Sequence, residues 1–187
     1  MSEHGTTREE LHLRQLDLRF YSRSDGLYEV EGRLVDQKRH AFRRQLATED
    51  TPAGVPLHDI VVRLVVDESL VVHDAQAKMQ ATPFTVCKGA ADTLAPLKGL
   101  RIGPGWNKQV RDLLRGAASC THVVELLGPL GTTALQGLAP HRLAQLNDPA
   151  NDAQRRARVD SCFAYSAKRE VVARLWPDLH QPPNPSR

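Results

Sequence analysis

The chain has 187 residues, of which 41% are hydrophobic and 25% are charged, and its net charge at pH 7 is +3. These values describe an ordinary globular protein that is long enough for one buried core. Aromatic residues make up only 5% of the chain, and its basic residues are scattered, which argues against a nucleic-acid-binding protein. No stretch approaches the about 18 apolar residues of a transmembrane helix, so we expect no membrane association.

The two ends of the chain have the composition of disordered segments. Residues 1–10 are polar and lack the apolar stretch of a secretory signal, and the proline-rich residues 178–187 form a tail. We therefore predict one folded domain at 11–177 between a disordered lead and a disordered tail. Three cysteines without a close pair favour free thiols in a reducing compartment, so we predict a cytoplasmic protein.

The first predicted element is a β-hairpin. Apolar and polar residues alternate over 11–20, with a one-residue shift between Leu13 and Leu16 that marks either a β-bulge or the true start of the strand. The Asp-Gly pair at 25–26 predicts a tight turn into a returning strand at 27–38.

A second hairpin follows a long connection. Residues 39–57 contain few apolar side chains and two prolines, and we predict a loop or flap of a length that is often functional. The strands of the second hairpin, at 60–66 and 70–77, are dense in β-branched residues, and a polar turn at 67–69 joins them.

Helices are predicted after the strands. A first helix runs over 87–97 with Gly99 as its C-terminal cap, and a second runs over 107–115. The longest apolar helical pattern opens at Cys120 and extends to Leu138, with Pro129 inside it as the cause of a kink or a break.

A polar segment and one more helix complete the predicted domain. Residues 139–157 are polar and predict a linker or a loosely packed segment, and an amphipathic helix at 169–176 ends before Pro177. Strands that precede helices are typical of an α+β fold, so we predict antiparallel β-hairpins followed by helices packed on one face.

Five side chains with ligand or catalytic chemistry stand at the ends of predicted elements. Cys120 and His122 open the longest helix, where free N–H groups and the helix dipole favour a thiolate or another anion. His58 and Asp59 begin a strand, and Cys87 begins a helix. Element ends on one side of a sheet can meet, and zinc and iron accept these residue types, so we hypothesise one shared site.

The same residues have structural interpretations. Free cysteines are often buried as small hydrophobic side chains, which is our interpretation of Cys162. His122 fits a helix cap, and Asp59 fits an acceptor for loop N–H groups. Glu125, one helical turn beyond His122, either orients the imidazole or faces solvent.

Four stretches resemble an uncharacterised bacterial family, domain of unknown function 2889. They are residues 28–36 (YEVEGRLVD), 56–59 (PLHD), 119–127 (SCTHVVELL) and 132–134 (TTA). The resemblance covers most of the chain, and the family name implies no activity.

A more distant resemblance is to the NifU-type iron–sulfur cluster scaffold domain. The stretch 57–59 (LHD), two strands and 72–75 (VHDA) are similar to the scaffold's Cys-Gly-Asp, hairpin and Asp-Ala pattern. Cys87 falls at the scaffold's second ligand cysteine, 97–99 (LKG) at its Lys-Gly pattern, and 120–122 (CTH) at its His-Cys pair. The resemblance implies a NifU/SufE-like fold.

The resemblance also implies a ligand set, with two departures from the scaffold. Leu57 stands where the scaffold has its first cysteine, which leaves His58 as a substitute, and the order of the last pair is reversed. The implied ligands are Asp59, Cys87, Cys120 and His122. A mixed set of this kind favours one zinc or iron ion over a labile cluster, because clusters prefer thiolate ligands.

Three hypotheses follow. The first is a cytosolic NifU-like protein that holds one zinc or iron ion at Asp59, Cys87, Cys120 and His122. The second is a metal-free enzyme in which Cys87 or Cys120 is the nucleophile and His122 is the acid/base, oriented by Asp59, while the 39–57 loop supplies cations to a small anionic substrate. The third is a binding or assembly protein without chemistry.

Overall fold

The computed structural model describes residues 6–146 and 151–182. The chain divides into two compact units, Met1–Gly137 and Leu138–Arg187, which we describe separately. The single folded domain that the sequence predicts at 11–177 stays a prediction. The predicted disordered ends lie partly outside the described residues, at 1–5 and 183–187.

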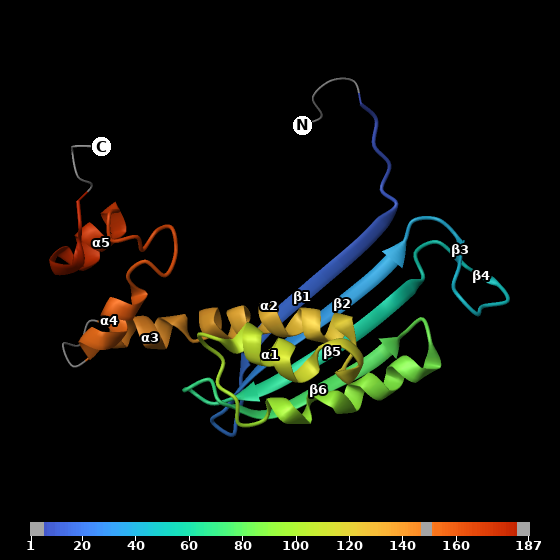
Figure 1. The fold of residues 1–187 in the computed structure, drawn as a ribbon, viewed down its shortest axis with the longest axis horizontal. Coiled ribbons are helices and arrows are strands. Elements are labelled where there is room, and N and C mark those ends of the chain that lie inside the picture. The colour runs from blue at the N-terminus through green and yellow to red at the C-terminus, as the bar shows by residue number, and fades with distance from the viewer. Residues whose placement is uncertain (1–5, 147–150, 183–187) are drawn as a thin grey trace. The chain divides into compact units, whose positions relative to one another are not determined.

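The first unit is built on a four-stranded antiparallel sheet with the order β1-β2-β5-β6 (Figure 1). Its strands are β1 (His12–Ser22), β2 (Tyr28–Lys38), β5 (Pro56–Val66) and β6 (Val72–Ala81). Within each hairpin, β1 with β2 and β5 with β6, the strands pair through short connections, as expected. Both predicted hairpins are confirmed, and Gly26 takes a φ of 82° in the first turn, which glycine adopts without strain.

The shift in the β1 pattern marks neither a β-bulge nor the start of the strand, which begins at His12. The β1–β2 pairing runs without a break in register from His12 opposite Lys38 to Ser22 opposite Tyr28. Alternation along β1 places Arg14 on the same face as Leu16. The apolar pattern is therefore interrupted because a polar residue occupies this face at position 14.

The connection between β2 and β5 contains a small ribbon that the sequence did not predict. It consists of β3 (Phe42–Arg43) and β4 (Asp50–Thr51). Arg43 Nε donates to Asp50 at 2.7 Å, and the Thr51 side chain is buried. Two-residue strands are too short to produce an alternating pattern, and this is why the sequence predicted a loop.

One face of the sheet is covered by helices. They are the 3₁₀ helix η1 (Thr85–Leu97), α1 (Trp106–Leu114), the turn η2 (Gly116–Ala118) and α2 (Thr121–Gly137). Helix α2 packs against β1, β2 and β5, while η1 packs against β6 and α1 packs against α2 (Figure 1). An α+β fold with an antiparallel sheet followed by helices is confirmed.

Helix α2 forms the largest part of the interface with the sheet. Pro129 lies inside it without dividing it. Fully buried apolar side chains come from both layers of this interface: Val30, Leu34, Ile60, Val62 and Leu64 from the sheet, and Val123, Leu126, Leu127 and Leu130 from the helix. Burial of this apolar surface is the main force that holds α2 on the sheet.

A close contact fixes α1 against α2. The indole N–H of Trp106 donates to the Leu127 carbonyl at 2.8 Å, which satisfies the one polar group of this buried side chain. A Cβ atom at Gly131 would lie only 2.8 Å from the Trp106 ring. The absence of a side chain at Gly131 therefore makes room for the indole.

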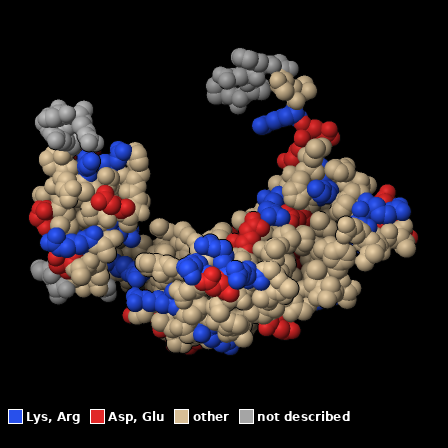
Figure 2. All heavy atoms as spheres, viewed as in Figure 1, with Lys and Arg blue, Asp and Glu red and all other residues tan. Residues whose placement is uncertain are grey.

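Charges of both signs cover this unit. In the face that Figure 2 shows, basic and acidic side chains lie interspersed over the helices and the end of the sheet. Within helix α1, Lys108 and Asp112 form a pair at 2.5 Å, and Arg14 of β1 and Glu125 of α2 form a pair at 2.7 Å. This face therefore has no broad field of one sign.

The second unit consists of short helices. They are α3 (Ala139–Gln145), α4 (Asp152–Arg158), α5 (Glu170–Leu175) and the 3₁₀ turn η4 (Pro177–Leu179). Short helices form within 139–157, where the sequence predicted a linker or a loosely packed segment, and α4 has no buried residue. Helix α5 is confirmed, and the Trp176 ring that follows it stacks on Tyr165 with a centroid separation of 5.6 Å.

The contact at Gly131 makes a first prediction. We expect Gly131→Ala to lower the free energy of unfolding by about 1–2 kcal/mol, because displacement of the Trp106 ring outweighs the gain in helix propensity. Urea unfolding followed by tryptophan fluorescence measures this loss.

The matched control is Gly89→Ala in η1, where a Cβ atom meets no atom within 4 Å. That variant should match the parent or exceed it slightly. Equal stabilities of the two variants would contradict the proposed role of Gly131.

Candidate metal centre

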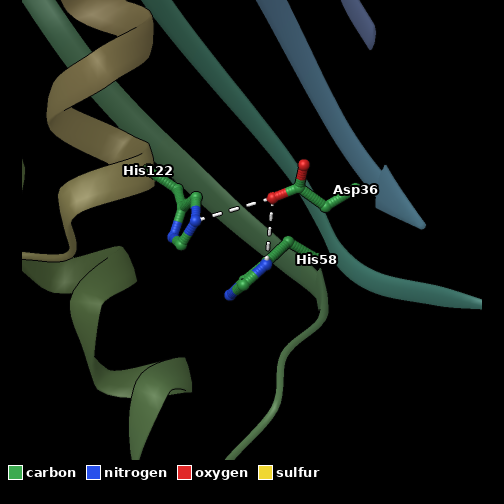
Figure 3. A group of neighbouring side chains, drawn as sticks. All are labelled: Asp36, His58 and His122. Carbon is green, nitrogen blue, oxygen red and sulfur yellow. Dashed lines mark ion pairs between the residues drawn. The ribbon is translucent and has the colours of Figure 1, made fainter. Parts of the chain in front are cut away.

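Three side chains with metal-ligating atoms meet at one end of the sheet, beside the start of α2 (Figure 3). They are Asp36 from β2, His58 from β5 and His122 from the first turn of α2. One ligand atom from each lies within 4.8 Å of the others. The same Asp36 oxygen, Oδ2, is 3.2 Å from His58 Nδ1 and 3.6 Å from His122 Nε2.

Strand pairing aligns the cluster. Asp36 lies directly opposite Arg14 of β1 and directly opposite His58 of β5. Side chains that face each other across antiparallel strands point to the same side of the sheet. In β2 this is the side of the buried Val30 and Leu34, so the chain places a carboxylate at the end of an apolar row under α2.

A guanidinium compensates the buried charge. The Asp36 side chain is only 2% exposed. Arg14 donates to both of its oxygens at 2.7 Å, His12 Nε2 lies 3.0 Å from Oδ1, and Arg14 also donates to Glu125 at 2.7 Å. Burial opposes ionisation of Asp36, but the hydrogen bonds and charge of Arg14 outweigh it and hold the pKa of Asp36 below its usual value. Asp36 is therefore a carboxylate at neutral pH.

The two clustered histidines are neutral. Burial, and then the positive charge that a protonated His122 would place beside it, lower the pKa of His58, and burial lowers the pKa of His122. Their ring centroids are 3.7 Å apart, so two imidazolium charges would repel each other strongly. Neutral imidazole is the form that binds metal ions.

His58 carries a buried nitrogen without a hydrogen bond. Its Nδ1 is 3.2 Å from Asp36 Oδ2, a distance that fits a hydrogen bond, but the two groups do not have hydrogen-bonding geometry. Among the described residues this buried atom has no hydrogen-bond partner. A buried nitrogen that faces a carboxylate without a hydrogen bond is costly unless another species engages both groups.

Cys120 contacts the outer side of the His122 ring. Its Sγ lies 3.6 Å from His122 Nδ1, while His122 Nε2 faces Asp36. If Nδ1 carries the proton and donates to sulfur, the lone pair of Nε2 points into the cluster. A hydrogen bond to the second ring nitrogen selects the tautomer of metal-binding histidines in this way.

The residues expected from the sequence lie in different places. His58 and His122 come together, and Cys120 contacts His122. Asp59 lies on the opposite face of the sheet, because adjacent strand residues point to opposite sides. There Arg33 donates to its two oxygens at 2.8 and 2.7 Å. Cys87 is half-buried in η1 and is not part of the cluster of ligand atoms.

Sequence reasoning missed Asp36, although a signal was present. Val30, Gly32, Leu34 and Asp36 alternate with charged or more exposed residues in β2, so the carboxylate continues the row of inward positions. A charged residue in such a row needs a partner, and Arg14 occupies the equivalent inward position of the preceding strand.

The sheet, helix α2 and this cluster all belong to the segment that a known family shares. The model of the family described as protein of unknown function (DUF2889) matches residues 12–136, which is 125 of the 187 residues. The chain therefore belongs to this family, as the motifs of the sequence indicated. No curated protein and no solved structure matches the chain.

Within the described part of the chain, the helices are all too short or too polar to cross a bilayer.

The lowered histidine pKa values make a second prediction. With a metal chelator present, we expect the free energy of unfolding to decrease as the pH falls from about 7 to about 5. The unfolded chain binds protons at its histidines near pH 6.5, whereas the folded chain resists protonation of His58 and His122. Denaturant unfolding across this pH range measures the effect.

His58→Asn is the matched variant, because the amide replaces Nδ1 and does not titrate. Its stability should depend less on pH over the same range. An unchanged dependence in this variant would show that His58 does not contribute to the loss.

Proposed function

We propose that the protein binds one divalent zinc or iron ion through Asp36, His58 and His122. Two imidazoles and one carboxylate form a known ligand set of catalytic zinc sites and of mononuclear non-haem iron sites. The observation that carries the proposal is the spacing of the ligand atoms. Two ligands at about 2.0–2.2 Å from one tetrahedral ion are about 3.3–3.5 Å apart, and the separations from Asp36 Oδ2 are 3.2 and 3.6 Å.

The surroundings of the cluster support the same proposal. The carboxylate is ionised and both histidines are neutral, so no group has to lose a proton before it binds the ion. Each carboxylate oxygen has two lone pairs, so Asp36 Oδ2 can accept from Arg14 and still bind an ion. Arg14 and Cys120 would hold Asp36 and His122 in position, as outer partners do in metal sites.

Three protein ligands leave at least one coordination position for water or a substrate. Sites of this kind activate bound water or polarise a bound oxygen, whereas structural zinc sites are closed by four ligands. The proposal therefore includes a reactive position on the ion rather than a purely structural role.

The NifU-type relationship and the cytoplasmic location are part of this proposal. The NifU-type resemblance names His58 as the substitute for a lost cysteine and His122 as a ligand, and these two rings are in contact. The antiparallel sheet followed by helices agrees with that fold class. Three free cysteines suit a reducing compartment.

Metal analysis makes a third prediction. Protein purified without chelator or oxygen should contain about one equivalent of zinc or iron. His58→Ala, His122→Ala and Asp36→Asn should each reduce this content by about tenfold or more, because each removes one of only three ligands. Elemental analysis, with circular dichroism as the test of folding, measures the outcome.

Cys87→Ser and Asp59→Asn are the matched controls. Both should keep the full metal content, because their side chains lie outside the cluster. A loss of metal in these two variants, with retention in His58→Ala and Asp36→Asn, would favour the ligand set inferred from the sequence. Metal-free wild-type protein would refute both sets.

One observation favours a second candidate, a thiol enzyme without metal. The His122 ring lies between the Cys120 thiol and the Asp36 carboxylate, with 3.6 Å to each. Nucleophile, imidazole and carboxylate in this order are the arrangement of cysteine hydrolases and transferases. In this candidate Asp36, and not Asp59, orients the imidazole, and Cys120 rather than Cys87 is the nucleophile.

Thiol reactivity makes a fourth prediction that separates the two candidates. If Cys120 is a nucleophile, iodoacetamide should alkylate it faster than Cys87 near pH 7, and His122→Ala should slow it about tenfold or more. Peptide mapping by mass spectrometry measures both rates. Equal rates at the two cysteines in metal-free protein would remove the enzyme candidate.

A further inference from the structure

Strand β1 forms one edge of the sheet, and no other strand of the described residues pairs with its outer side. The opposite edge strand, β6, differs in this respect. At the start of β6, the backbone N–H of Val72 donates to the Leu100 carbonyl, and the Val72 carbonyl accepts from the Gly99 N–H. Helix η1 also packs against β6. The two edges of the sheet are therefore not equivalent (Figure 1).

The outer edge of β1 has charged side chains, among them the inward-pointing Arg14, but lacks the other protections of an edge strand. Proteins protect such edges with charged side chains, proline, bulges or very short strands. β1 has 11 residues, His12–Ser22, without proline, lysine or glycine, and its pairing with β2 has no bulge. Apolar surface accompanies this edge, since Leu16 is 40% exposed and Tyr21 is 41% exposed. A long, regular and partly apolar edge is a template for another strand.

The pattern of side chains on β1 is symmetric about Leu18. On the helix-facing side Leu16 and Phe20 flank Leu18 at equal distances along the strand, and on the other side Asp17 and Arg19 flank it. When two copies of β1 run antiparallel with Leu18 opposite Leu18, each Leu16 faces a Phe20 and each Asp17 faces an Arg19. Apolar pairs and opposite charges in directly opposed positions stabilise an antiparallel pair of strands.

Neighbouring registers are less favourable. A register centred on Asp17 sets the two Asp17 carboxylates against each other, and a register centred on Arg19 does the same with the two guanidinium groups. Directly opposed like charges are destabilising. The charges therefore select the register centred on Leu18.

The geometry points to a homodimer in which two β1 strands pair antiparallel about Leu18 and form one continuous eight-stranded sheet. Residues that face each other across this pair lie on the same side of the sheet, so the helices of both copies cover one face. The contact is isologous, which is the commonest symmetry of soluble oligomers. Closure of the two edges removes both unpaired strand edges at once.

Asp17 and Arg19 can form their ion pairs between two copies instead of within one chain. Within one chain Arg19 donates to Asp17 at 2.7 Å, and their side chains are 62% and 56% exposed. Exposed pairs of this kind add little to the stability of one chain. Asp17 and Arg19 can therefore exchange partners between copies at little cost.

Charge reversal tests the dimer and its register together. Sedimentation velocity from about 1 µM to about 1 mM should show a dimer of the full-length protein. Asp17→Arg and Arg19→Asp should each raise the dissociation constant about tenfold or more, because both contacts become repulsive. An equimolar mixture of the two variants should dimerise as the parent does, and so should the double variant Asp17→Arg/Arg19→Asp.

Every other outcome contradicts the inference. A monomer across the whole range would show that β1 does not pair with a second copy. A dimer that neither single variant weakens, or that the mixture does not restore, would place the contact elsewhere or in another register. Circular dichroism verifies that these exposed substitutions leave the fold intact.

Discussion

The paired hydrogen bonds between the Arg14 guanidinium and the Asp36 carboxylate make the candidate centre feasible. A carboxylate at 2% exposure under an apolar helix would be neutral without a counter-charge. Arg14 sits directly opposite on β1 and keeps its own contact with solvent, so the ion pair is buried at one end only. The charge of Asp36 then makes the adjoining space, lined by His58 and His122, favourable for a cation.

Helix α2 links this polar end of the sheet to its apolar middle. Leu126 and Leu130 bind the helix to the sheet, and His122 lies one turn earlier on the same helix. The hydrophobic contacts thus set the position of the imidazole, and the site needs no dedicated loop to hold it. Close-packed cores transmit small shifts, so the spacing of the three ligand atoms depends on the position of α2 on the sheet.

The strands and most helices could be predicted because their periodic patterns are long, as in β5 and α2. Part of the site could also be predicted, since Cys120 and His122 stand at a visible helix start. The sequence pattern indicated Asp59 as a ligand. In the strand, however, the neighbouring His58 points to the inward face, so Asp59 points to the opposite face, where Arg33 binds it. Asp36 was missed because an inward carboxylate inside a strand has no motif, and its partners are brought to it by strand pairing. Ribbon β3–β4 and helices α3 and α4 were missed because they are too short for a period to show.

The three ligand atoms come from two strands and a helix that are far apart in the chain. During synthesis the hairpins that hold Asp36 and His58 emerge first, and His122 can join them only after α2 has left the ribosome and has docked. Contacts between residues so distant in sequence form late, because the loop between them must close first. An ion bound at this centre would therefore be captured by an almost completely folded chain, and its uptake would be a final step of maturation rather than a nucleus for folding.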